Sequence, residues 1–210
     1  MKIEEAYKDL FMICEEVKTE AYSKLPSDFH IRSCRKDELS FWKDMHFDRP
    51  EDAKKYRYTI DEYFENTYGG KEELFFVKCL MVCNKSDTPI ATCFIWKSYN
   101  RINTVQWLKV NKKYENKGIG RALLTIILDK QDYPVYLSTQ TRNFRAIKLY
   151  SDFGFKLLSN SFIGDRRNEL KEALPILQKY MTPEAYQNLD VSKAPDDFIE
   201  FMQSITTKEF

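Results

Sequence analysis

The sequence predicts an α/β fold, of the α+β kind, with one mixed sheet and helices on its faces. Three observations predict it. Apolar stretches separated by short polar turns fill residues 74–110, helical stripes of apolar residues flank this region, and a strand, a helix and a strand follow closely from residue 104 to residue 139. Short turns favour antiparallel strands, whereas a helical crossover favours parallel ones. A sheet that is antiparallel first and parallel later satisfies both patterns.

Helical spacing dominates the first 70 residues. The apolar residues between positions 3 and 22 follow a helical period that ends before Pro26, which predicts a helical extension ahead of the main domain. Residues 29–34, FHIRSC, alternate like a short strand. Residues 36–47 and 53–68 then favour two helices, the second of which ends at the Gly69–Gly70 pair.

Three strands and a crossover are expected next. The strands LFFVKCLMVC (74–83), PIATCFIW (89–96) and TVQWLKV (104–110) are joined by short connections, which predicts an antiparallel meander. Residues 119–127 carry the apolar stripe of a core-facing helix, and PVYLST (134–139) is another strand. The two strands that flank this helix are expected to be parallel, with a right-handed crossover.

The last third of the chain is mostly helical in pattern. A helix is expected over residues 143–153, terminated by Gly154, and then a strand within FKLLSNSF, residues 155–162. From Arg166 onward the pattern is helical, with helix starts at Thr182 and within residues 192–197. We therefore predict an N-terminal helical extension (1–28), a central domain (29–163) and a C-terminal helical extension (164–210).

Composition argues against several classes of protein. The 33 basic and 32 acidic residues nearly cancel, so we expect no nucleic-acid partner. The acidic start MKIEEAYKDL differs from a secretory signal, and no apolar run approaches the ~20 residues of a membrane span, so we expect a cytoplasmic protein without a membrane partner. The five cysteines, none in a CxxC pair, and the two histidines predict buried thiols and no metal site.

The stretch NKGIGR, residues 116–121, joins a predicted strand to a predicted helix. A helix N-terminus presents unpaired N–H groups, and glycines allow a phosphate to approach them. The loop is therefore a candidate pyrophosphate cradle. The alternative is that Gly118 and Gly120 only shape a tight turn. The loop matches neither the Walker pattern, which needs Gly-Lys-Ser/Thr, nor the GxGxxG dinucleotide pattern.

Two motifs in this chain resemble the GNAT superfamily of N-acetyltransferases. Residues 115–120, ENKGIG, are similar to its acyl-CoA loop, Gln/Arg-x-x-Gly-x-Gly/Ala, and residues 143–155 are similar to its second signature, Asn-x-x-Ala-x-x-Leu-Tyr-x-x-x-Gly-Phe. The resemblance covers residues 29–163 and implies the GNAT acyl-CoA N-acyltransferase fold with acetyl-CoA as cofactor. One departure is Glu115, whose carboxylate stands where the pattern has Gln or Arg and implies weaker coenzyme A binding.

The resemblance also implies roles for individual residues. Tyr150 would be the general acid that protonates the departing thiolate; the alternative is that it is a structural aromatic residue. Backbone groups at the end of the central strand would bond the pantetheine arm and the thioester oxygen, and the glycine loop would hold the pyrophosphate. The residues expected to bind the cofactor are Leu108, Lys109, Val110, Glu115, Asn116, Lys117, Gly118, Ile119, Gly120, Arg121, Asn143 and Ala146.

The acceptor side is less specific in sequence. Gln106 is expected to face the acceptor but cannot take a proton at neutral pH, so a general base is expected elsewhere. His46 and Asp48 are candidates, with a solvated loop as the alternative, and Thr139 and Thr141 either bond substrate or end a strand. The aromatic residues of the two early helices favour an apolar amine, whereas their acids, Glu51, Asp52, Asp61 and Glu62, favour a cationic one.

These observations lead to one main functional hypothesis. We expect an acetyl-CoA-dependent N-acetyltransferase that transfers an acetyl group to the amine of a small molecule or peptide by direct attack. The alternative is a catalytically silent acyl-CoA-binding regulatory protein, and a third class is a phosphate-loop protein outside this superfamily. The terminal helices would also allow a homodimer.

Overall fold

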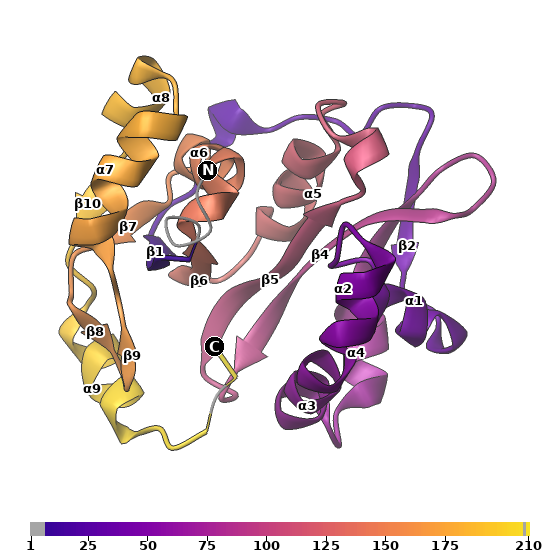
Figure 1. The fold of residues 1–210 in the computed structure, drawn as a ribbon, viewed down its shortest axis with the longest axis horizontal. Helices are drawn as coiled ribbons and strands as arrows, with labels where there is room; N and C mark the ends of the chain where they lie inside the picture. Colours follow the sequence, from indigo (N-terminus) through magenta and orange to yellow (C-terminus); the bar gives the residue numbers. More distant parts are fainter. Residues whose placement is uncertain (1–6, 208) are drawn as a thin grey trace. The chain divides into compact units, whose positions relative to one another are not determined.

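The structure, a computed structural model, describes residues 7–207, 209 and 210 (Figure 1). These residues fall into two compact units. The first unit comprises residues 7–21, 132–207 and 210, and the second comprises residues 22–131 and 209. Each unit has its own strands and its own helices, so the α/β class predicted from the sequence is confirmed.

An antiparallel meander organises the second unit. Strand β3 pairs with β2 and β4, and β4 pairs with β5, so the strand order is β2-β3-β4-β5. Its strands are β2 (His30–Ser33), β3 (Leu80–Cys83), β4 (Pro89–Ser98) and β5 (Ile102–Val110). Its α-helices are α1 (Leu39–Asp44), α2 (Pro50–Lys55), α3 (Arg57–Tyr68), α4 (Glu72–Lys78) and α5 (Ile119–Leu128), and 3-10 turns form at Lys36–Glu38 and Lys112–Tyr114.

Aromatic side chains form the core of the second unit. Trp42 on α1 is fully buried, and its ring centroid lies 4.9 Å from that of Phe75 on α4. Because side chains alternate along a strand, Met81 and Phe94 point from β3 and β4 into this cluster, while Val82 is buried on the opposite face. The early helices therefore cover one face of the meander with packed rings.

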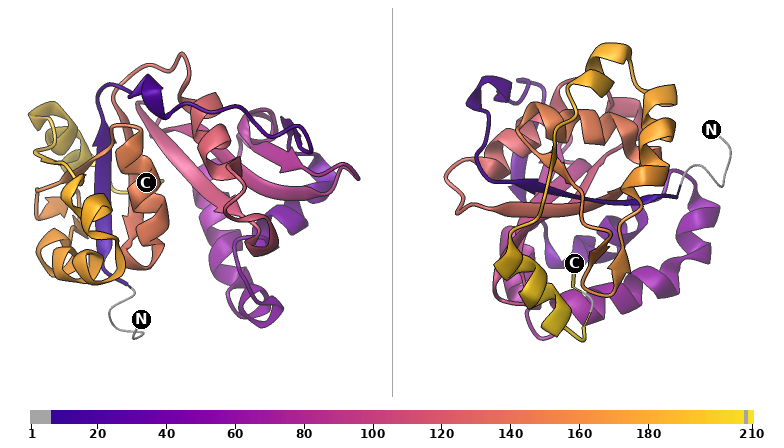
Figure 2. Two further views of the ribbon diagram at one scale, coloured as in Figure 1. Left: turned by 90° about the horizontal axis from the view of Figure 1, so that it is seen from above. Right: turned by 90° about the vertical axis from the view of Figure 1, so that its left-hand side faces the viewer.

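The first unit is built around strand β1 (Figure 2). Strand β1 is antiparallel to β6 on one side and to β7 on the other, and β10 is parallel to β7, so the strand order is β6-β1-β7-β10 and the sheet is mixed. The strands are β1 (Asp9–Cys14), β6 (Val135–Gln140), β7 (Lys156–Leu158) and β10 (Val191–Ser192), with a separate pair β8 (Phe162–Ile163) and β9 (Arg166–Arg167). The helices are α6 (Phe144–Asp152), α7 (Leu170–Tyr180), α8 (Pro183–Gln187) and α9 (Asp196–Ser204), with 3-10 turns at Thr19–Ala21 and Thr141–Asn143.

The N-terminal helix expected over residues 3–22 was a wrong prediction. Residues 1–6 lie outside the described residues, and Asp9–Cys14 is strand β1. Every residue from Leu10 to Cys14 is fully buried, because the strand has a partner on both sides and both of its faces are covered. The described residues 7–28 are therefore not a helical appendage, since they supply a central strand of the first unit.

Two further expectations need correction. The first half of LFFVKCLMVC is helix α4, so the strand begins only at Leu80. The tail contains the expected helices, and Thr182 caps α8 by accepting a bond from the N–H of Ala185 at 3.3 Å. However, the tail also contributes β10 to the sheet, so residues 164–210 are more than a helical extension.

Several smaller expectations are confirmed. Gly154 follows α6 at φ +93°, and a Cβ there would lie 2.8 Å from the carbonyl oxygen of Glu16, so this position requires glycine. All five cysteines are buried free thiols. Across residues 7–207, 209 and 210, no helix is long and apolar enough to cross a membrane.

Candidate acyl-transfer site

The glycine loop leads from β5 into helix α5. Asn116 and Gly118 both adopt left-handed backbone conformations, with φ +61° and +79°, and Gly118 is the residue from which α5 begins. The first backbone bond of the helix runs from the N–H of Ala122 to the carbonyl of Gly118, at 3.0 Å. The N–H groups before it have no acceptor within the helix, as at every helix start.

The space around Gly118 suits an anionic ligand. No atom lies within 4 Å of the position that a Cβ on Gly118 would take. The positive end of the α5 dipole adds to the attraction for a phosphate. Lys117 lies beside the loop, with its ammonium 5.2 Å from the centre of the Tyr114 ring, and Glu115 is partly buried. These residues fit the pyrophosphate of an acyl-CoA.

Strand β5 is bulged where the sequence predicts the acyl group to lie. Thr92 pairs with Lys109 and Phe94 pairs with Gln106, so Trp107 and Leu108 together face Cys93. Trp107 has φ +54°, which is unusual for a bulky residue. A bulge takes backbone groups out of the ladder and is common beside active sites. Lys109 and Val110 return to regular pairing, and sequence reasoning did not detect Trp107.

Gln106 is tied into a buried polar network. Its side-chain oxygen accepts hydrogen bonds from the hydroxyls of Tyr63 and Tyr68 at 3.0 and 3.3 Å, and its amide donates to Oγ1 of Thr104 at 3.0 Å. The indole of Trp107 donates to the Tyr68 hydroxyl at 3.1 Å. The network therefore fixes the bulged part of β5 in place. A contact between Gln106 and the acceptor stays a prediction.

His46 lies between two indole rings. Its centroid is 4.7 Å from that of Trp42 and 4.2 Å from that of Trp107. Nε2 is buried and makes no hydrogen bond to the described residues. Burial, with a smaller contribution from the positive charge of Lys109, lowers the pKa of His46 to about 3. The ring is therefore neutral at physiological pH and would be a weak proton acceptor there.

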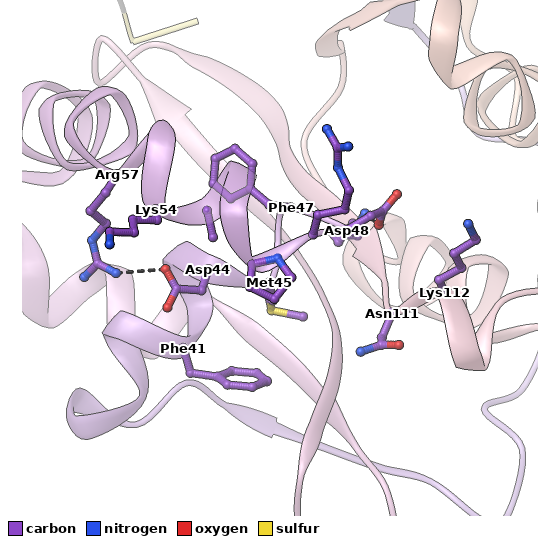
Figure 3. A pocket seen from close by; sticks show the side chains of 13 residues that line it. Phe41, Asp44, Met45, Phe47, Asp48, Lys54, Arg57, Asn111 and Lys112 are labelled. Carbon is purple, nitrogen blue, oxygen red and sulfur yellow. Dashed lines mark hydrogen bonds and ion pairs between the residues drawn. The ribbon is translucent and has the colours of Figure 1, made fainter. Parts of the chain in front are cut away.

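A cavity of about 610 Å³ opens between the start of α2 and the end of β5 (Figure 3). Asp48, the second predicted acceptor-side residue of this loop, lines it and accepts a bond from Lys109 Nζ at 2.6 Å. The apolar part of the lining comes from Phe41, Met45, Phe47, Pro50 and Ala53. The remaining polar lining comes from Asp44, Arg49, Lys54, Arg57, Asn111 and Lys112. Sequence reasoning placed the early helices over the acceptor but did not identify Asn111 and Lys112.

The other predicted residues lie in the first unit. Tyr150 on α6 is 7% exposed, and its ring centroid is 5.7 Å from that of Phe155. Asn143 precedes the same helix and donates from its amide to the Thr139 hydroxyl at 3.3 Å, while Ala146 is partly buried one turn later. Thr141 is buried and its hydroxyl accepts a bond from the N–H of Lys8 at 3.3 Å, which ties the end of β6 to the start of β1.

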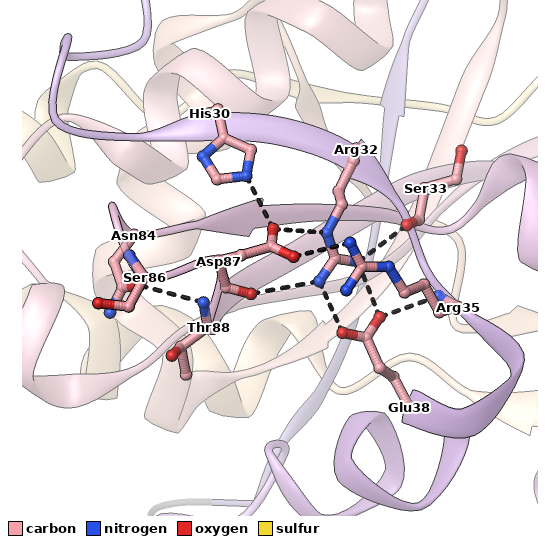
Figure 4. A network of polar contacts seen from close by, with 9 residues as sticks. All are labelled: His30, Arg32, Ser33, Arg35, Glu38, Asn84, Ser86, Asp87 and Thr88. Atoms are coloured by element: carbon pink, nitrogen blue, oxygen red, sulfur yellow. Dashed lines mark hydrogen bonds and ion pairs between the residues drawn. The ribbon is translucent and has the colours of Figure 1, made fainter.

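A second polar cluster, around Asp87, is an ion-pair network (Figure 4). His30, Cys83 and Asp87 bring possible metal-ligand atoms within 4.8 Å of one another. However, Asp87 accepts bonds from Arg32 Nε at 2.9 Å and from Arg35 at 2.7 Å, and the bond from Arg32 is the main reason that its pKa is lowered. Two guanidinium charges would repel a metal cation, so this network gives a physical reason against a metal site here.

The bulged strand, the glycine loop and the helix that begins at Ile119 follow one another along the chain. Residues 74–157 match the family model described as an acetyltransferase (GNAT) domain. The matched segment contains the bulge, the loop and Tyr150. No curated protein matches the chain.

Three solved structures show a partial similarity to this chain. A Drosophila protein is 19% identical over 72% of this chain and 48% of its own, with a TM-score of 0.48. A GCN5-related N-acetyltransferase from Sphaerobacter thermophilus is 16% identical over 64% and 43%, with a TM-score of 0.43. A GNAT-family acetyltransferase from Colwellia psychrerythraea is 16% identical over 72% and 53%, with a TM-score of 0.45. The match thus spans about half the length of each of these chains.

Proposed function

We propose that this chain is an acetyl-CoA-dependent N-acetyltransferase that acts by direct attack of an amine on the thioester. The observation that carries the proposal is the GNAT match over residues 74–157, which includes a glycine loop with open space at Gly118. The five buried free thiols fit a reducing compartment and support a cytoplasmic location.

Different parts of the chain would bind the cofactor and stabilise the charge that develops during the reaction. The N–H groups at the start of α5 would hold the cofactor pyrophosphate, and backbone groups freed by the bulge at Trp107 and Leu108 would bond the thioester oxygen as charge develops on it. Bound acetyl-CoA supplies the activated acetyl group. The amine nitrogen bonds to the acetyl carbon, the carbon–sulfur bond breaks, and the sulfur leaves with the bonding electrons.

Two protons must move during this transfer. The hydroxyl of Tyr150 would give its proton to the departing sulfur, because a tyrosine, pKa about 10, and a thiol, pKa about 8.5, are close enough for such an exchange. The amine loses a proton to solvent, since the Gln106 amide cannot accept one and the pKa of His46 is too low for an efficient base.

The first test is a thermal shift with acetyl-CoA, coenzyme A and ATP. A ligand at 100 times its dissociation constant adds about 2.7 kcal/mol, which raises the midpoint by several degrees in a chain of this size. Release of coenzyme A is then followed with a broad panel of amines. Binding of acetyl-CoA without amine-dependent release would favour the silent regulatory alternative. A shift with ATP and none with coenzyme A would favour a different phosphate-binding protein.

A further inference from the structure

The cavity beside β5 carries an excess of positive charge. Its lining includes five cationic side chains and two carboxylates. Both carboxylates are already paired with a cation of the lining, Asp48 with Lys109 at 2.6 Å and Asp44 with Arg57 at 2.9 Å. Arg49 is paired with Asp52 at 2.7 Å. The acidic charge in the cavity is therefore neutralised.

Two lysines of the lining have no such partner. The side chains of Lys54 on α2 and Lys112 after β5 form no hydrogen bond or ion pair within the described part of the chain. They lie toward opposite ends of the cavity, Lys54 beside Arg57 and Lys112 beside Asn111 (Figure 3). Both are exposed, so each ammonium can reach a ligand that enters from solvent. Unpaired ammonium groups at a cavity attract a carboxylate or a phosphate.

The acids that favoured a cationic amine in the sequence do not line this cavity. Asp61 accepts bonds from Lys43 at 2.7 Å and from Arg57 at 3.3 Å, and Asp52 is held by Arg49. Glu51 and Glu62 are exposed residues outside the lining. The charge that remains at the cavity therefore favours an anionic ligand.

The apolar lining indicates the rest of the ligand. Phe41 is 42% exposed, and Phe47 stacks on Tyr56 with ring centroids 6.0 Å apart and planes 12° from parallel. A volume of about 610 Å³ is within the usual range of small-molecule sites, and such sites combine apolar walls with a few polar anchors. An amino-acid derivative or a short peptide fits this combination.

We propose that this cavity binds the anionic group of the acceptor, an amine that also carries a carboxylate or phosphate, with Lys54 and Lys112 as the anchoring residues. The proposal rests on the N-acetyltransferase function proposed above and narrows its substrate class. Phe41 and Phe47 would pack against the apolar body of the same molecule. Cationic polyamines, and amines that carry no carboxylate or phosphate, would be poor acceptors.

The test uses a reaction product as a probe, so that binding is measured without catalysis. Binding of N-acetyl-phenylalanine and of its uncharged amide is measured by titration calorimetry on the full chain. Lys54→Gln and Lys112→Gln are compared with Lys55→Gln and Lys113→Gln, which change neighbouring lysines outside the lining. We expect wild type to prefer the carboxylate by about tenfold, each lining variant to lose most of this preference, and the controls to keep it. The preference should also weaken as salt is added.

Three outcomes separate the possibilities. Equal binding of the acid and the amide, or equal loss in lining and control variants, overturns the proposal. Weaker acetyl-CoA binding in Lys112→Gln, with probe binding unchanged, assigns that lysine to the cofactor phosphates and overturns its role as an acceptor anchor. Charge-dependent probe binding without acetylation of any amine supports the anionic site and contradicts the proposed function instead. An N-acetylated amino phosphonate distinguishes phosphate from carboxylate preference.

Discussion

The ring of His46 lies 4.2 Å from the indole of Trp107, the residue that carries the bulge of β5 at φ +54°. The contact joins the loop between α1 and α2 to the strand predicted to receive the acyl group. It also buries a histidine that has no hydrogen-bond partner at Nε2 among the described residues. Two consequences follow, one for acid stability and one for the pH dependence of the reaction.

Acid should destabilise the protein through His46. The pKa of His46 is about 3 in the folded protein and 6.5 for an exposed histidine. Between pH 6.5 and about pH 3 the unfolded chain therefore binds a proton at His46 that the folded chain does not bind. Stability is therefore lost as the pH falls through this window, by about 2 kcal/mol between pH 8 and pH 5. We expect His46→Phe to remove this part of the pH dependence in urea unfolding. His30→Gln, at the exposed second histidine, should keep it.

The same pKa constrains the reaction. A neutral His46 cannot produce an inflection in the rate between pH 5 and pH 9. We therefore expect the pH profile of kcat/KM to have the same apparent pKa values in His46→Phe as in wild type, even if the rate itself falls. A shift of an inflection in the variant would show that His46 titrates during turnover.

Tyr150→Phe should separate chemistry from binding. Loss of a general acid typically lowers the rate by ~100-fold or more, whereas acetyl-CoA affinity should change little because the ring stays in place. Single-turnover kinetics and calorimetry with acetyl-CoA give the two quantities. Tyr136→Phe is the control, since it removes a hydroxyl from another buried tyrosine of the first unit. An unaltered rate in Tyr150→Phe would leave this tyrosine with a structural role alone.

Gly70 is a matched control position for Gly118. Both have left-handed backbones, with φ +79° and +72°, and both have open space where a Cβ would stand. Alanine should therefore cost about 1 kcal/mol of stability at either position. Acetyl-CoA affinity should fall at least tenfold in Gly118→Ala and not in Gly70→Ala. Equal affinities in the two variants would contradict the pyrophosphate cradle.

Strand β1 should be essential to the first unit. Ile13 is fully buried and faces Tyr136 on one neighbouring strand and Lys156 on the other. We expect Ile13→Ala to cost about 2–5 kcal/mol in chemical denaturation, as for other large-to-small core changes. Tyr7→Ala, at a residue that is 51% exposed just before the strand, should cost little. Similar losses in the two variants would argue against a central position for β1.

Local signals predicted much of the fold. Helix α5 was predictable because Ile119, Leu123 and Ile127 follow a helical stripe and all three are buried. The turn at residues 84–88 was predictable because Asn84 and Asp87 are turn formers between two apolar stretches. In both cases residues close in sequence determine the local structure.

The errors have a common physical cause. Leu10 to Cys14 is an apolar run buried on both faces, and periodicity cannot distinguish such a strand from a buried helix. The same ambiguity hid the change from α4 to β3 within the mostly apolar stretch 74–83, although Glu72 and Glu73 mark a helix start. The strand identity of β1 depends on partners more than 100 residues away, which no local pattern contains.

The candidate site was predicted in its motifs but not in its contacts. Gly118 and Tyr150 stand in recognisable patterns, whereas the bonds of Tyr63 and Tyr68 to Gln106 join residues 43 and 38 positions apart. The positive φ of Trp107 also has no sequence signal, because a bulky residue there is held by its packing against His46 and its bond to Tyr68. Lys54 and Lys112 line the same cavity only because of the tertiary fold.

The position of β1 sets an order for folding during synthesis. Residues 22–131 leave the ribosome as one continuous block and can form the β2-β5 meander at once. Strand β1 emerges before them, but its partners β6 and β7 are translated after residue 131, so five fully buried apolar residues stay unpaired in the interval. At roughly 5–20 residues per second this wait lasts about 6 to 30 seconds. During that time the nascent chain exposes an apolar segment to solvent, and the first unit can close only by joining its two distant ends.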